Sequence, residues 1–106
     1  MPKYLMEVSY TAEGAKGLLK DGGSKRLAAA KALVASVGGT LDAMYYAFGS
    51  ADAIVIVDAP DAASVAAASI ALGASGAVTS KTTALLSVED IDAAVKKSAS
   101  YRAPGQ

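Results

Sequence analysis

Histidine, cysteine and tryptophan are all absent from this sequence of 106 residues. Without cysteine, the chain forms no disulfide bond and offers no thiolate ligand to a metal ion. Without histidine, it lacks the commonest general base and the commonest metal ligand, which excludes Ser–His–Asp and Cys–His nucleophile systems within one chain. We therefore expect the protein to hold no metal and no cofactor.

An excess of charge of either sign is also missing, because 10 Lys and Arg residues balance 10 Asp and Glu residues. A neutral chain without a basic stripe binds nucleic acid poorly, since attraction to phosphates dominates that affinity. The longest weakly polar stretch, residues 62–78, is rich in alanine and interrupted by Ser and Gly, which argues against a membrane span. With no signal-peptide pattern at the start, we expect a soluble cytoplasmic protein that binds neither nucleic acid nor membranes.

Strand and helix periodicities alternate along most of the chain. Strands are predicted at residues 3–10, 40–48, 52–58 and 78–86. Helices are predicted at residues 24–37, from Asp61 to about Leu72, and after the cap Ser87, while Thr11 caps a short helical turn before a loop at Gly22-Gly23. The order β-α-β-β-α-β with a terminal helix predicts a ferredoxin-like α+β fold, with a four-stranded antiparallel sheet and both main helices on one face. We take residues 1–97 as one domain and residues 98–106 as a disordered tail.

The predicted hairpin from Thr40 to Pro60 is apolar on both faces. In its second arm Val55 and Val57 point one way, and Ile54 and Ile56 point the other way. One layer of helices covers only one face, and leaving large side chains in water forgoes roughly 1.5–3 kcal/mol each. The side chains expected on the uncovered face are Ile54, Ile56, Tyr46 and Phe48. We therefore expect a homodimer or higher homo-oligomer with paired sheets, while the sequence leaves open which face meets the helices.

Three stretches resemble the GYD domain family: KYLMEVSYTAEGAKGLLKDGGSKR, GGTLDAMYYAFGSADAIVIVDAPD and SGAVTSKTTALLSVEDIDAAVKK. Together they cover nearly the whole chain up to Lys97. The resemblance implies a dimeric α/β barrel, in which two ferredoxin-like sheets pair, and it supplies no catalytic residues. Gly49 and Asp52 match the family's motif, but the family's aromatic residue between them is missing here.

Five residues are candidates for binding a small molecule: Tyr10, Tyr46, Phe48, Asp52 and Lys81. Asp52 stands beside a glycine turn, where it either binds a ligand or, more commonly, bonds turn amides. Lys81 lies among threonines and reaches either a pocket or the solvent at the sheet edge. The three aromatic residues either line a pocket between sheet and helices or belong to the core or an interface.

A second candidate site comprises Gly22, Gly23, Ser24 and Lys25. Glycines, a cap and a cation at a helix N-terminus present N–H groups that can hold an anion. The GxxxxGK[ST] pattern of a P-loop is absent, and a plain loop with an N-cap at Ser24 is the commoner meaning of such a segment.

Three functions fit these observations. The favoured one is a homo-oligomeric binding or structural module without catalysis of its own. A second is a cofactor-independent isomerase or monooxygenase-like enzyme that uses Tyr, Asp or Lys in a pocket, and a third is a small-anion sensor. An enclosed cavity of about 300 Å3 or more, with such groups converging in it, would favour the enzyme or the sensor.

Overall fold

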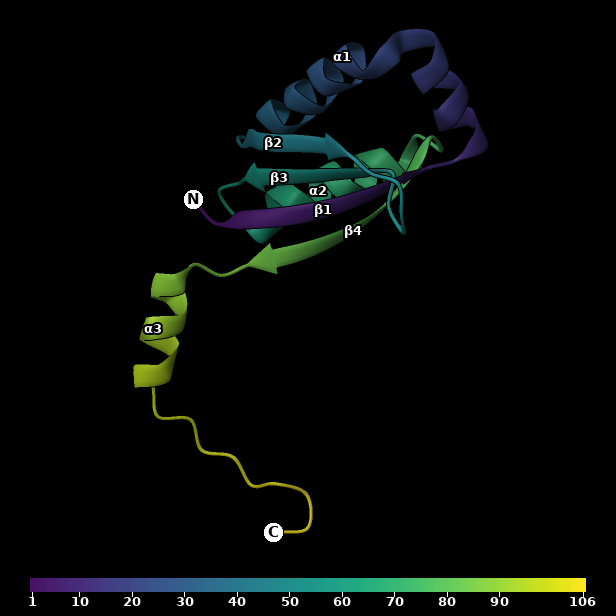
Figure 1. Ribbon diagram of the computed structural model, residues 1–106. Coiled ribbons are helices and arrows are strands. Elements are labelled where there is room, and N and C mark those ends of the chain that lie inside the picture. Colours follow the sequence, from purple (N-terminus) through teal and green to yellow (C-terminus); the bar gives the residue numbers. More distant parts are fainter.

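The computed structural model describes residues 1–106 and contains four strands and three helices. Their order is β1 (Lys3–Tyr10), α1 (Ala12–Ser36), β2 (Thr40–Tyr46), β3 (Ala53–Asp58), α2 (Ala62–Ala74), β4 (Val78–Leu85) and α3 (Val88–Lys96). Figure 1 shows α1 and α2 packed against the sheet, with α3 beyond the end of β4. The α+β fold and the ferredoxin-like order with a C-terminal helix are thus confirmed.

The sheet is antiparallel throughout, in the order β2-β3-β1-β4. β3 and β1 are therefore central, while β2 and β4 form the edges. Met6 lies opposite Val55 and Val8 lies opposite Ala53, and all four side chains are buried. The face that meets the helices is consequently the one that carries Val55 and Val57 in β3.

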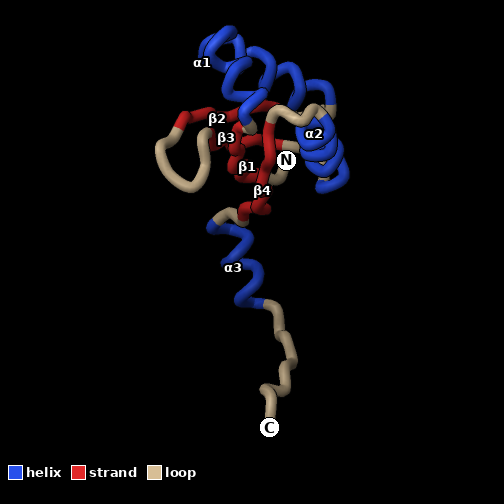
Figure 2. Tube along the Cα trace, turned by 90° about the vertical axis from the view of Figure 1, so that its right-hand side faces the viewer, coloured by secondary structure: helices blue, strands red, loops and turns tan.

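The core lies between this face and the two main helices. One buried cluster contains Tyr4, Met6, Val34, Val55, Val57, Ala59 and Val65. Val34 comes from α1 and Val65 from α2, so both helices lie on the same side of the sheet (Figure 2). Full burial of side chains of this size stabilises the fold by about 1.5–3 kcal/mol each.

Helix α1 consists of two helical segments that meet at a kink at Gly22, whose φ is 77° and ψ 171°. Glycine tolerates this left-handed φ because it has no Cβ. Thr11 caps the first segment as predicted, since its hydroxyl accepts from the Gly14 N–H at 3.2 Å. The prediction of a loop at Gly22-Gly23 with an N-cap at Ser24 was wrong, because only Gly22 leaves the helix and Ser24 lies within helical backbone.

Strand β2 contains a bulge that the sequence pattern did not reveal. Leu41 pairs with Val57 and Ala43 pairs with Ile56, so Asp42 is an extra residue. After the bulge, each side chain of β2 points to the face opposite the one that simple alternation predicts, because one inserted residue shifts the pattern by one position. The expectation that Tyr46 shares the face of Ile54 was therefore wrong: Tyr45 lies opposite Ile54 instead.

Three of the predicted strands are also longer than the observed ones. β2 ends at Tyr46, so Phe48 lies in the connection to β3 and is fully exposed. β3 begins at Ala53 and β4 ends at Leu85, each one residue inside its predicted limit. Each strand ends where its residues no longer pair with the neighbouring strand, and the amino-acid composition does not indicate that position.

Helix α3 stands apart from the rest of the fold (Figures 1 and 2). Ser87 caps it as predicted: its hydroxyl accepts from the Asp90 N–H, and the Asp90 carboxylate accepts from the Ser87 N–H, both at 3.0 Å. This capping box stabilises a short helix from within. No residue of α3 is buried, and residues 98–106 form no further helix or strand.

Candidate functional site

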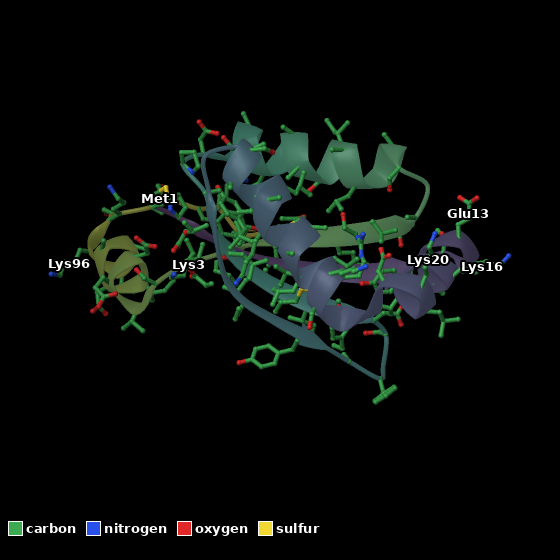
Figure 3. The ribbon with its side chains drawn as sticks, turned by 90° about the horizontal axis from the view of Figure 1, so that it is seen from above. Met1, Lys3, Glu13, Lys16, Lys20 and Lys96 are labelled. Atoms are coloured by element: carbon green, nitrogen blue, oxygen red, sulfur yellow. The ribbon has the colours of Figure 1, made fainter.

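An apolar cavity of about 90 Å3 lies between the two main helices and the sheet. Figure 3 looks down on this side, where α1 and α2 run across the sheet and the labelled Lys16 and Lys20 lie at one end of α1. The lining side chains from α1 include Ala29, Ala30 and Leu33, and α2 contributes Ala68 and Leu72. Small alanine side chains facing the sheet leave this space unfilled, because they reach less far than the Leu and Val residues around them.

Arg26 is the single charged residue among the 14 that line the cavity. It is half-buried and forms no ion pair, since the two ion pairs of the structure are both made by Lys3. Arg26 is not among the candidate residues that the sequence pattern indicated. The spacing from Arg26 to Ala30 and Leu33 is four and then three residues, which is the signal that identifies one helix face.

Two tyrosines lie beside Arg26. Tyr10, at the end of β1, lines the cavity, and the Tyr46 hydroxyl donates to the Gly23 carbonyl at 3.2 Å. Burial raises the pKa of Tyr46, the neighbouring Tyr10 raises it further, and the positive charge of Arg26 opposes both effects. The structure therefore brings together two of the predicted aromatic candidates, together with an arginine that sequence analysis missed.

The other predicted ligand-binding residues lie elsewhere. The Asp52 carboxylate accepts from the Tyr10 N–H at 2.8 Å, and the Asp52 N–H donates to the Val8 carbonyl at 2.8 Å. Asp52 thus ties the end of β1 to the start of β3. Lys81 lies opposite Glu7 on the other side of the sheet, where both line a polar hollow together with Ser9 and Thr79. Phe48 touches neither the cavity nor this hollow.

The predicted anion-binding residues lie at the kink of α1. Ser24 and Lys25 are exposed, and the Gly23 carbonyl already accepts from Tyr46. The Ser24 hydroxyl and the Lys25 ammonium group form no hydrogen bond or ion pair within the chain. Anion binding at Gly22, Gly23, Ser24 and Lys25 stays a prediction.

The face of the sheet opposite the helices is uncovered. Five apolar side chains on β1, β2 and β3 form what we call the open-face patch: Leu5, Ala43, Tyr45, Ile54 and Ile56. Their neighbours on the β4 side are polar: Glu7, Ser9, Thr79, Lys81 and Thr83. One end carries a charged group in which Lys3 donates to Asp42 and, at 2.9 Å, to Asp58. The open face is therefore half apolar and half polar.

No helix is long and apolar enough to cross a membrane. No group of three or more acidic side chains is arranged to hold a metal ion. The cytoplasmic location and the absence of a cofactor stay predictions.

A family model described as GYD domain matches residues 4–95 of the 106-residue chain. The match spans every strand and nearly all of α3. No curated protein matches the chain, and no solved structure matches it either.

Proposed function

Because this chain belongs to the GYD domain family, we propose that it is a homo-oligomeric binding module that assembles through its open sheet face and has no catalysis of its own. The open-face patch carries the proposal. Its side chains lie on the strand face that no helix covers, and Tyr45 is 66% exposed. Contiguous apolar surface of this kind marks an interaction site, and a two-fold axis lets the same patch cover itself.

The candidate catalytic groups support a binding role rather than an enzyme. The Asp52 carboxylate already accepts a hydrogen bond from a backbone N–H of β1. Lys81 lies on the opposite side of the sheet from Tyr10. The cavity of about 90 Å3 is well below the roughly 300 Å3 of typical substrate pockets. The candidates Tyr10, Asp52 and Lys81 therefore do not converge in one enclosed space.

The apolar cavity supports ligand binding as the function of the assembled module. It lies on the helix side, so pairing through the open face leaves its surroundings unchanged. Assembly and ligand binding thus belong to opposite faces of the same sheet.

Replacing Ile56 by Glu tests the assembly. Ile56 lies in the centre of the open-face patch, opposite both Leu5 and Ala43, so a carboxylate there would be desolvated in a paired sheet. We expect light scattering at micromolar concentration to give twice the chain mass of 10.5 kDa for the wild type and the single-chain mass for Ile56→Glu.

Ile70→Glu is the matched control, because Ile70 is 71% exposed on α2, outside the open face. This variant should keep the wild-type mass. Far-UV circular dichroism checks that both variants fold. A wild-type protein that stays at the single-chain mass, or an Ile56→Glu variant that still assembles, contradicts the proposal.

A further inference from the structure

The cavity between the helices and the sheet combines an apolar lining with one unpaired cation. Of its 14 lining residues, 13 are hydrophobic and the remaining one is Arg26. Guanidinium groups keep their charge at all relevant pH values. A half-buried guanidinium without a partner ion is available to an anion, and an anion that carries its own apolar body also fills the cavity.

Tyr10 also lines the cavity, and Tyr46 lies close to both Tyr10 and Arg26. A tyrosine hydroxyl donates one hydrogen bond, and an arginine donates two parallel bonds to a carboxylate. The three side chains come from β1, β2 and α1, so they meet only in the folded protein.

The size of the cavity limits the apolar part of a ligand. Its volume of about 90 Å3 is smaller than the roughly 150 Å3 cavity that accommodates benzene in an engineered protein. The cavity therefore has room for only a few carbon atoms, and a short unbranched chain fits best. Ala29, Ala30 and Ala68 provide this narrow space, because larger residues at these positions would close it.

We propose that the cavity binds the chain of a small aliphatic monocarboxylic acid, with Arg26 and Tyr10 holding its carboxylate. This inference names the ligand class for the proposed binding role and rests on it. Arg26 and the cavity lie on the helix side, so a partner chain seated on the open face does not reach them.

A titration with butanoate, followed by the 1H–15N NMR spectrum, tests the proposal. We expect saturable shifts at the amides of Ala30 and Leu33, which line the cavity. Butanol offers an apolar chain without the charge and should bind roughly tenfold or more weakly, because a charge-assisted hydrogen bond is lost.

Arg26→Met keeps an apolar stem and removes the charge. It should weaken butanoate binding roughly tenfold or more and leave butanol binding unchanged. Lys25→Met is the matched control, because Lys25 is the adjacent cation but is exposed and does not line this cavity. It should bind butanoate like the wild type.

Ala68→Leu fills the cavity from α2 and should abolish the shifts for both ligands, provided that thermal unfolding shows a folded protein. The proposal is overturned if butanoate leaves Ala30 and Leu33 unshifted, or if Arg26→Met binds butanoate as tightly as the wild type does. The mass of the same samples reports assembly separately, so this inference and the proposed assembly fail independently.

Discussion

Gly14 holds the start of α1 against the turn that precedes β4. A Cβ built on Gly14 would lie 1.9 Å from the Ala77 carbonyl oxygen, whereas a Cβ on Gly17 meets nothing within 4 Å. Because Ala77 offers backbone rather than a flexible side chain, Gly14→Ala should lower the free energy of unfolding by about 1–3 kcal/mol.

Gly17→Ala serves as the control on the same helix. The two substitutions change the entropy of the unfolded chain equally, and Gly17→Ala should raise stability by about 0.4–1 kcal/mol. Urea denaturation of both variants measures the difference. Equal stability of the two variants would show that the contact with Ala77 is unimportant.

Tyr46 gives the fold a dependence on alkaline pH. Its pKa is raised above 10.0, first by burial and then by Tyr10. In the unfolded chain Tyr46 loses its proton at about pH 10. Its contribution to the free energy of unfolding is therefore complete below that pH, and it is lost as the pH rises through the pKa of Tyr46 in the folded protein. Urea midpoints should therefore fall less above pH 10 in Tyr46→Phe than in the wild type. Identical alkaline profiles for the two proteins would refute this assignment.

At the scale of elements, helix caps and glycines were the sequence features from which the fold was predicted. Thr11, Asp61 and Ser87 all cap helices through the backbone N–H three residues later, and the predicted order of strands and helices is confirmed. Such signals are local, because a cap and its partner lie within one turn. The local sequence was therefore sufficient for the element order and for the sheet that this order implies.

The face assignments in β2 depended on information that is not local. The extra residue Asp42 becomes visible only in the pairing with β3, and it moves Tyr46 to the helix side. The same limit applied to the candidate site. Arg26 has helical spacing to Ala30 and Leu33, but only the packing of α1 over the sheet shows that this face borders a cavity.

At the scale of the whole molecule, the open face alone is small for a stable interface. With strands about 4.8 Å apart and about 3.3 Å per residue, a sheet of four strands of at most eight residues presents on the order of 500 Å2. Stable interfaces bury about 800 Å2 on each partner, and half of this face is polar. An assembled form therefore needs contacts beyond the sheet.

Helix α3 offers such a contact surface. Val88, Ile91 and Val95 recur at helical spacing, and all three are exposed. Leu85, on the open-face side of β4, and exposed Leu86 lie between the sheet and this stripe. Apolar side chains thus continue from the end of β4 onto the C-terminal helix, where a second copy has a further surface to contact.

Replacing the stripe by serine, in the triple variant Val88→Ser, Ile91→Ser and Val95→Ser, should therefore weaken assembly at least tenfold in a dilution series followed by sedimentation. The fold of the single chain should survive, since none of these side chains is buried in it. The control replaces Glu89, Asp92 and Lys96 by serine; these residues are charged and belong to the same helix. If the two triple variants dissociate at the same concentration, α3 does not take part in assembly and the contacts beyond the sheet lie elsewhere.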